Sequence, residues 1–223
     1  MISIIIPVLN EERALPATLQ HVFSQAGEFE VIVVDGGSTD NTLAIVSQDS
    51  RIQLFTAATG RASQMNAGAQ HASGDWLLFL HADTLLPRNA LLSIEQLSPE
   101  HQAGGFKHRF SGHAWNLRLI SWMHNFRCRW TRIFYGDQAM FVRRELFTEL
   151  GMFPNEPMLE DLLFSEQLVK VTRPVILDSY VITESRKFEQ NGVWLSFWRV
   201  LLILASHELH LPIPAKKFFA NVR

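Results

Sequence analysis

Residues 31–42 read VIVVDGGSTDNT, and this stretch decides the fold. A run of β-branched residues ends at Asp35, and the two glycines that follow allow a tight turn before polar residues that can start a helix. Strand-like runs of the same kind lie at 2–8, 52–55 and 75–80, with helix-forming segments between them. Strands that alternate with helices predict a parallel α/β sheet over the first ~85 residues.

The predicted sheet has polar residues where three of its strands end. Asn10, Asp35 and Asp83 each follow a strand, and ligand sites in such sheets lie beyond the carboxyl ends of the strands. We therefore expect these three side chains to lie along one edge. The Rossmann dinucleotide-binding fold fits less well, because the first turn, Pro7-Val-Leu-Asn-Glu-Glu12, has no glycine that would let a pyrophosphate approach the backbone.

The alternation becomes less regular after Asp83. Further strands are predicted at 104–110, 139–142 and 175–177, and further helices at 91–97, 115–130, 144–150, 160–169 and 192–206. Since the chain shows no repeat or linker, we expect one domain over 1–190 and a C-terminal helical extension over 191–223, packed on that domain or on a membrane surface. The apolar stretch 193–205 is shorter than the ~20 residues that span a bilayer, so no membrane span is expected.

The formal charge of −2 conceals an uneven distribution. Residues 1–100 hold 11 acids and 4 Lys or Arg, whereas 101–136 hold 6 Lys or Arg, 4 histidines and no acid. We expect no nucleic-acid partner, because a nucleic acid would face the acidic first hundred residues. One cysteine and an N-terminus without signal-peptide features predict a cytoplasmic protein, free or peripheral on the inner face of the cell membrane.

The acid-free segment is also rich in aromatic residues. Trp115, Trp122 and Trp130 recur at helical intervals among arginines. Three interpretations are open at this point. The tryptophans pack on the sheet while the arginines face water, or a basic amphipathic helix lies on an anionic membrane surface, or the arginines bind an acceptor that carries phosphate or carboxylate.

An ordered series of motifs runs over residues 2–190. It reads Ser3-Ile-Ile-Ile-Pro-Val-Leu-Asn-Glu-Glu12, the segment 31–42, Gly60-Arg-Ala-Ser-Gln-Met-Asn-Ala-Gly68, His81-Ala-Asp83, Tyr135-Gly-Asp-Gln138 and Glu160-Asp161. The series resembles family 2 glycosyltransferases of the GT-A fold, and most of all their small bacterial branch associated with arsenosugar biosynthesis. The resemblance implies a Rossmann-like nucleotide-binding sheet flanked by helices. It also implies an inverting transferase of the hexosyltransferase type, which moves a sugar from a nucleotide-diphosphate sugar, UDP being the first expectation, to an acceptor hydroxyl in one metal-assisted displacement.

The same resemblance assigns residues to the nucleotide. Asp35 matches an acid that accepts hydrogen bonds from base or ribose, and Arg61 matches a basic residue that donates paired bonds to phosphate. The other residues assigned to nucleotide binding are Pro7, Asn10, Glu11, Ala82, Arg186 and Lys187. Alternatives stay open: Asp35 orders the glycine turn, Asn10 caps the following helix, and the pair at 186–187 is surface charge.

A divalent cation is the implied cofactor. Asp83 matches the second acid of the Asp-x-Asp signature, which holds Mn²⁺ or Mg²⁺ against the diphosphate. The first acid is replaced by His81, and imidazole binds Mn²⁺ but suits Mg²⁺ poorly. His81 is therefore a candidate metal ligand, a hydrogen-bond donor to the nucleotide, or a side chain satisfied by the backbone.

The catalytic candidates are acids near the end of the motif series. Asp161 is the expected general base with Glu160 in support, and Asp137 is a second candidate near the acceptor. A helix N-terminus favours an ionised carboxylate, so base strength must come from burial or from late proton transfer. The expected partners are the sugar-nucleotide donor and an unidentified hydroxyl acceptor, anionic or lipid-linked. The alternatives are a non-catalytic or altered-metal sugar-nucleotide binder and a nucleotidyltransferase on a similar sheet.

Overall fold

The computed structural model describes residues 1–156, 158–209 and 211, apart from the side chain of Lys187. The first part of the chain forms the predicted parallel strands, which are β1 (Ile2–Val8), β2 (Phe29–Asp35), β3 (Ile52–Thr56) and β4 (Trp76–Phe79). β1 lies between β2 and β4, and β3 pairs with the far side of β2. The α/β fold predicted for this part is confirmed.

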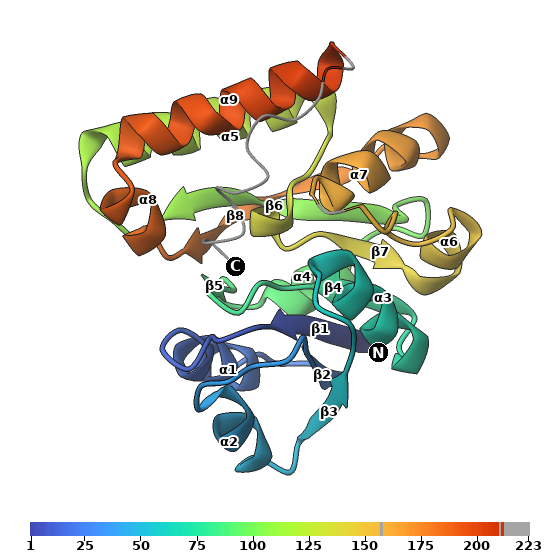
Figure 1. The fold of residues 1–223 in the computed structure, drawn as a ribbon. Coiled ribbons are helices and arrows are strands. Elements are labelled where there is room, and N and C mark those ends of the chain that lie inside the picture. The colour runs from blue at the N-terminus through green and yellow to red at the C-terminus, as the bar shows by residue number, and fades with distance from the viewer. Residues whose placement is uncertain (157, 210, 212–223) are drawn as a thin grey trace.

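The second part of the chain extends the sheet with mixed pairing. Its strands are β5 (Thr84–Leu85), β6 (Ala103–Phe110), β7 (Phe141–Arg143) and β8 (Val175–Thr183). β7 runs antiparallel to both β4 and β6, β6 runs parallel to β8, and the short β5 pairs antiparallel with β8 at the edge. The order across the sheet of the described chain is β3-β2-β1-β4-β7-β6-β8-β5 (Figure 1).

β8 differs from the sequence prediction, which places the last strand at 175–177. The strand continues to Thr183. Its pairing with β6 shifts register between Phe106 and Lys107, and the Lys107 ammonium pairs with Asp178 at this irregularity. A bulge of this kind lets polar residues remain inside a strand.

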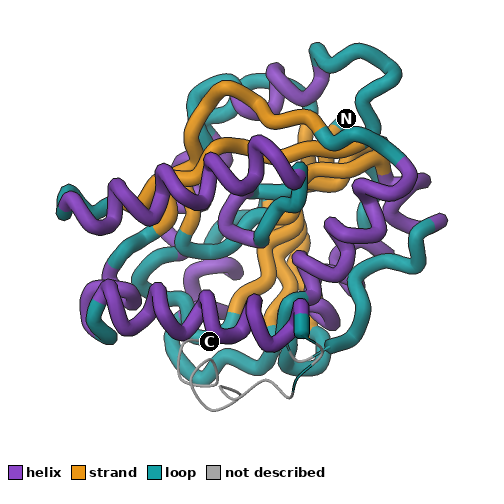
Figure 2. Tube along the Cα trace, turned by 90° about the horizontal axis from the view of Figure 1, so that it is seen from above, coloured by secondary structure: helices purple, strands orange, loops and turns teal. Residues whose placement is uncertain are grey.

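Helices cover both faces of the sheet, and the strands run between them when seen from above (Figure 2). One face carries α1 (Leu15–Phe23), α2 (Thr42–Ser47) and α4 (Ala90–Glu95), and the other carries α3 (Arg61–His71), α6 (Arg144–Glu149) and α7 (Glu160–Val171). Because strand side chains alternate, Ile4 and Ile6 join the first core and Ile5 joins the second. α3 approaches closely at Gly68, where a Cβ would lie 2.5 Å from Ile5 Cγ2.

Two long helices, α5 (Trp115–Thr131) and α9 (Val193–Glu208), lie together beyond β6 and β8 (Figure 1). Leu117 and Ile120 of α5 are buried against α9, whereas Trp115, Trp122 and Trp130 are 68%, 61% and 76% exposed. The interpretation that these tryptophans pack on the sheet is therefore wrong, because aliphatic side chains fill that contact. Among the described residues, every helix is too short or too polar to traverse a lipid bilayer.

Three short elements were not predicted from the sequence. They are β5, the 3₁₀ turn η1 (Gly136–Gln138) and α8 (Arg186–Gln190). η1 follows α5 and reaches the strand ends, so it carries Asp137 toward the residues that follow β4. α8 joins β8 to α9.

Candidate active site

A cavity of about 520 Å³ lies where β1 and β4 end. It brings together most of the residues that the sequence predicts for the site, namely Pro7, Glu11, Arg61, His81, Ala82, Asp83, Asp137 and Asp161. Apolar side chains of α9, which include Phe197, Leu201 and Leu204, line it as well. The cavity therefore combines charged groups from the sheet edge with an apolar surface from the C-terminal helix.

Arg61 begins α3 and is held by a buried acid. Its Nε lies 2.9 Å from Oε1 of Glu160, whose side chain is 1% exposed. Its Nη1 lies 3.5 Å from Nε2 of His81. Burial lowers the pKa of His81, and the nearby Arg61 charge lowers it further, so the imidazole is neutral at physiological pH. Glu160 thus orients a guanidinium at the cavity while Arg61 compensates its buried charge.

Asp83 is fixed by the segment that follows β8. Its carbonyl accepts a hydrogen bond from the N–H of Glu184 at 3.0 Å, and its Oδ1 accepts one from the Thr84 hydroxyl at 3.3 Å. Thr84 in turn contacts the Thr183 hydroxyl at 3.1 Å. These contacts fix the Asp83 backbone through Glu184 and its carboxylate through Thr84.

Asp161 also lines the cavity, and it lies in the first turn of α7. The N–H of Gly136 donates to its Oδ2, and the N–H of Leu162 donates to its Oδ1 at 2.8 Å. Burial, together with the neighbouring Glu160 charge, raises the pKa of Asp161 to about 6. Burial therefore outweighs the helix N-terminus, and Asp161 has the basicity that a proton acceptor near neutral pH needs.

Gly136 lies close to both His81 and Asp161. A Cβ at this position would overlap the His81 imidazole and lie 3.2 Å from Oδ2 of Asp161. Only a glycine lets the backbone of η1 come this close while its N–H reaches the carboxylate.

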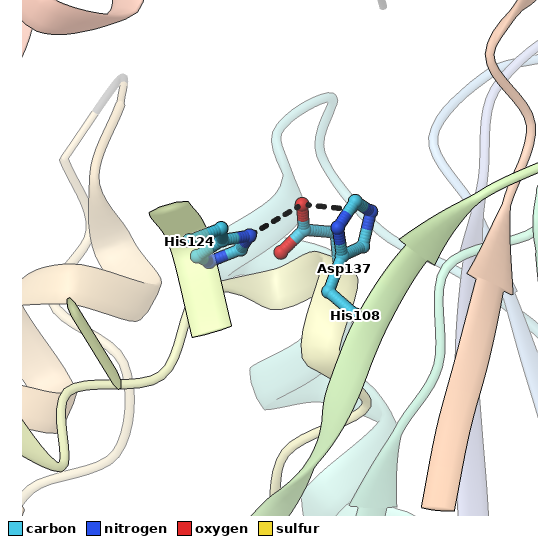
Figure 3. Close-up of side chains that lie close together, drawn as sticks. All are labelled: His108, His124 and Asp137. Carbon is cyan, nitrogen blue, oxygen red and sulfur yellow. Dashed lines mark ion pairs between the residues drawn. The ribbon is translucent and has the colours of Figure 1, made fainter. Parts of the chain in front are cut away.

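Asp137 is held next to two histidines from other elements (Figure 3). Its Oδ2 lies 3.5 Å from Nε2 of His108, on β6, and 3.8 Å from Nδ1 of His124, on α5. Burial lowers the pKa of both histidines, that of His124 to about 3, so both imidazoles are neutral. Asp137 is thus surrounded differently from Asp161, and the two carboxylates are not equivalent candidates for the base.

Several predicted residues lie beside the cavity and do not line it. Asp35 accepts hydrogen bonds from the N–H groups of Gly37 and Ser38 at 2.9–3.1 Å, as expected if it orders the glycine turn. Asn10 does not cap α1: its Oδ1 accepts a bond from the N–H of Thr39 at 2.8 Å, which ties the loops after β1 and β2 together. Both residues do lie at the predicted sheet edge.

The basic pair after β8 is only partly described. Arg186 pairs with Glu184, with 3.0 Å between Nη2 and Oε2, and the Arg186 side chain is 36% exposed. This is the geometry of surface charge. The Lys187 side chain lies outside the described residues, so its assignment to the nucleotide stays a prediction.

The sequence analysis missed other residues at the cavity. His124, Arg127 and Tyr135 all line it, and the Arg127 guanidinium lies 3.8 Å from the centre of the Tyr135 ring. The signal was the acid-free segment itself, for which the sequence leaves three interpretations open, one of them with the arginines against an anionic acceptor. In the structure His108, His124 and Arg127 of this segment point inward, whereas His113 and the tryptophans are exposed.

A larger groove of about 1040 Å³ adjoins this region, between α5 and the strands β6 and β8. Many of its lining residues are basic, and they include Lys107, Arg109, Arg118, Arg129 and Arg132. The acids Asp83 and Asp161 lie in the smaller cavity, which is therefore the candidate for the chemistry. Among the described residues that line the larger groove, Asp178 is the one carboxylate, and it pairs with Lys107.

Comparison of the sequence and fold with known proteins shows the family to which the chain belongs. A PGL/p-HBAD biosynthesis glycosyltransferase of Mycobacterium bovis is 34% identical over 171 residues, which are 69% of this chain. The chain spans 63% of the length of that relative.

Two solved structures share the fold. Staphylococcus aureus TarS 1–349 in complex with UDP-GlcNAc has a TM-score of 0.66 at 21% identity, over 82% of this chain and 58% of that one. The mannosyltransferase PcManGT of Pyrobaculum calidifontis, in complex with GDP-Man and Mn²⁺, has a TM-score of 0.63 at 23% identity, over 81% and 56%. These likenesses establish the GT-A fold. Residues 3–153 match the family model "Glycosyl transferase family 2", and the chain belongs to this family.

Proposed function

We propose that this protein transfers a sugar from a nucleoside-diphosphate sugar, with a UDP-sugar as first candidate, to an acceptor hydroxyl by a single displacement with inversion. The observation that carries the proposal is one cavity in which Arg61, Asp83 and Asp161 converge from three separate elements. This reaction needs a carboxylate that accepts a proton, a carboxylate that holds a metal ion and a positively charged side chain that binds phosphate. Asp161, Asp83 and Arg61, respectively, would supply them. Placement in the arsenosugar-associated branch rests on the motifs alone.

The donor would lie across the ends of β1 and β4. Arg61 faces the cavity and would donate hydrogen bonds to the diphosphate. Pro7, Glu11 and Ala82 would contact the nucleoside, and Asp35 would act on it through the turn that its carboxylate holds. Both relatives in the structural comparison were solved with a sugar nucleotide, which supports this class of donor.

The residues present fit a divalent cation. Asp83 offers a carboxylate oxygen at the cavity, and a Mg²⁺ or Mn²⁺ ion needs only one or two protein carboxylates when diphosphate oxygens supply other ligands. When bound, the ion would neutralise charge on the leaving diphosphate. His81 is better placed as a partner of Arg61, because its Nε2 lies 3.5 Å from the guanidinium.

Asp161 is the proposed base. Its raised pKa suits proton transfer near pH 7, and Gly136 and Leu162 hold the carboxylate in place. It would accept the acceptor hydroxyl proton as the oxygen attacks the anomeric carbon on the face opposite the leaving diphosphate. Such an attack inverts the configuration and needs no covalent sugar–enzyme intermediate.

A ligand panel tests the proposal. UDP-, GDP- and dTDP-sugars, each with Mg²⁺ or Mn²⁺, are compared by thermal denaturation. A ligand at 100 times its Kd raises the free energy of unfolding by ~2.7 kcal/mol, which is about 5–10 °C in Tm for a chain of this size. At least one donor should raise Tm in wild type and in the exposed control Asp75→Asn, but much less in Asp83→Asn. Product NMR then reports inversion at the anomeric carbon.

Each alternative has its own outcome in this panel. Donor binding without transfer to any hydroxyl acceptor and without hydrolysis would identify a non-catalytic sugar-nucleotide binder. Stabilisation by nucleoside triphosphates instead of sugar nucleotides would favour a nucleotidyltransferase. Loss of transfer with retained donor binding in Asp161→Asn supports the assigned base, and near-normal transfer removes it.

We also infer that the acceptor is presented at an anionic lipid surface. α5 and α9 expose adjoining aromatic residues: the rings of Trp115 and Trp194 lie 5.8 Å apart, and Trp198 is 60% exposed. Arg118 and Arg129 are exposed on the same helix as the tryptophans. Amphipathic helices with tryptophans and basic residues bind anionic membrane surfaces, and the basic groove beside them would accept a phosphate or carboxylate of the acceptor.

Vesicle co-sedimentation tests this surface. Wild type should bind vesicles with anionic lipid at low salt and be released at high salt. Trp122→Gln combined with Trp198→Gln should reduce binding, whereas Val171→Gln, at another exposed apolar residue, should not. Wild-type protein that stays in the supernatant at low salt contradicts the inference.

A further inference from the structure

We propose that His108, His124 and Asp137 form a second metal site, which binds a transition-metal ion of the Zn²⁺ class and is distinct from the cation assigned to Asp83. Within the described residues, this is the one group of three or more His, Cys, Asp or Glu side chains whose ligand atoms converge closely enough to share an ion. It extends the proposed function without depending on it, because metal binding is measured in the absence of any sugar nucleotide.

The geometry fits a shared ion better than direct contacts. The three ligand atoms lie within 4.8 Å of one another, and the two His–Asp separations are 3.5 and 3.8 Å. A charge-assisted hydrogen bond would be ~2.7–2.9 Å long. Ligands at ~2.1 Å from a tetrahedral Zn²⁺ lie ~3.4 Å apart. The two His–Asp separations are close to that spacing, whereas the two histidine nitrogens, which lie within 4.8 Å of one another, would move closer on binding the ion.

The cluster also contains buried polar atoms that the described protein atoms leave unpaired. Of the three converging ligand atoms, Nε2 of His108 has no hydrogen-bond partner in the described part of the chain. The other ring nitrogen of His108, Nε2 of His124 and Oδ1 of Asp137 also lack a partner among the described residues, although they are not the converging atoms. The His108 side chain is 1% exposed, so its nitrogens face protein on all sides. Unpaired buried polar atoms are rare in native proteins and call for a partner such as an ion.

The donor set selects the class of metal. Two imidazole nitrogens and one carboxylate oxygen are typical of Zn²⁺ and related ions, whereas Mg²⁺ prefers oxygen ligands alone. The three residues also come from β6, α5 and η1, which are parts of the packed core and hold the ligands in place.

The surroundings of the cluster give an ion a path from solvent and supply negative charge to balance its positive charge. His124 and Asp137 line the 520 Å³ cavity, which gives the ion a path from solvent. Arg127 is the nearby positive charge, and its guanidinium lies over the ring of Tyr135. The carboxylates of Asp137 and Asp83 both act on His108, so negative charge at the site offsets that of Arg127.

Metal stoichiometry tests the proposal on the full, tag-free chain. After treatment with a chelator, the protein is dialysed against Zn²⁺ with millimolar Mg²⁺ to occupy oxygen sites, and bound zinc is measured by mass spectrometry. Co²⁺ replaces Zn²⁺ in a second experiment, where visible absorption reports nitrogen ligation. Wild type should bind one Zn²⁺ per chain and give a low-symmetry Co²⁺ spectrum.

Variants locate the ion. His124→Gln and Asp137→Asn should weaken Zn²⁺ binding by more than the ~10–100-fold that loss of an outer partner of a metal ligand costs. His113→Gln, at an exposed histidine, and Asp83→Asn should each still bind one Zn²⁺. Circular dichroism checks folding, and if His124→Gln does not fold, Asp137→Asn decides.

Three results would overturn the proposal. They are no stoichiometric Zn²⁺ in wild type, equal Zn²⁺ affinity in Asp137→Asn, or loss of the ion in Asp83→Asn with retention in Asp137→Asn. The cluster would then be a metal-free set of neutral imidazoles that positions Asp137. None of these results bears on whether sugar nucleotides bind, so this test and the donor panel fail separately.

Discussion

Replacing Asp161 by asparagine should change how the stability of the protein depends on pH. Burial and the Glu160 charge raise the pKa of Asp161 from 3.8 to about 6. Each pKa unit corresponds to ~1.4 kcal/mol, so the ionised carboxylate costs the fold roughly 3 kcal/mol at neutral pH. Between these two pKa values the folded chain holds more protons at this group than the unfolded chain does. Stability therefore falls as pH rises through that window.

The size of this pH-dependent change in the free energy of unfolding follows from the two pKa values. Between pH 5 and pH 7.5, this one carboxyl should lower the wild-type free energy of unfolding by about 1.4 kcal/mol. Asparagine does not titrate and lacks that loss. It also loses one of the two backbone hydrogen bonds that Gly136 and Leu162 donate to Asp161, at a cost of ~1–3 kcal/mol at every pH. The pH dependence of the difference, and not its absolute size, is therefore the informative quantity.

Urea denaturation at pH 5 and pH 7.5 measures this quantity. Relative to wild type, Asp161→Asn should gain about 1.4 kcal/mol between the two pH values, while Glu100→Gln, at an exposed carboxyl, should follow wild type. In transfer assays, kcat/KM of wild type should fall below about pH 6, because only about a tenth of Asp161 is ionised at pH 5. If the free energy of unfolding changed equally between pH 5 and pH 7.5 in wild type and Asp161→Asn, the inference that this carboxylate is buried would be refuted.

Three further substitutions probe the same cavity. Gly136→Ala should cost ~1–3 kcal/mol in urea denaturation and reduce kcat more than donor affinity, because the new Cβ displaces His81; unchanged kcat would contradict the close packing at this residue. Arg61→Gln leaves the buried Glu160 carboxylate unpaired, so thermal melting should show a loss of ~3–5 kcal/mol at neutral pH, and a loss near zero would show that the pair is not buried. Asp35→Ala removes the acceptor of the turn N–H groups and should cost ~1–3 kcal/mol, with weaker UDP binding by calorimetry; intact UDP affinity would leave Asp35 a purely structural role.

The parallel part of the fold could be predicted because its signals are local. β-branched runs, a glycine turn and helical spacing are signals that each lie within about ten residues. They predicted β1 to β4 and the sheet edge along which Asn10, Asp35 and Asp83 lie. β5 could not be predicted, because a two-residue strand forms only through its pairing with β8. The extent of β8 likewise depends on a register shift in its partner strand.

The candidate site divides in the same way. Asp161 could be proposed as the base from its motif, but the direction of its pKa shift could not be predicted. A helix N-terminus contributes only ~0.3–1 kcal/mol, whereas burial, which raises the pKa, is a property of the packed chain. The meeting of His108, His124 and Asp137 was also outside the reach of the sequence. Their meeting depends on how α5 is oriented across β6. The helical pattern of α5 predicted only which face carries the tryptophans.

The pairing of β5 with β8 has a mechanical consequence. Asp83 immediately precedes β5 and is bonded through its carbonyl to Glu184, and that residue leads into α8 and α9. α9 also lines the cavity and exposes Trp194 and Trp198 on its outer side. A displacement of α9 that reaches the end of β8 therefore pulls on the backbone of Asp83. The aromatic surface of α9 and the position of Asp83 at the cavity are therefore connected through α8, Glu184 and one backbone hydrogen bond.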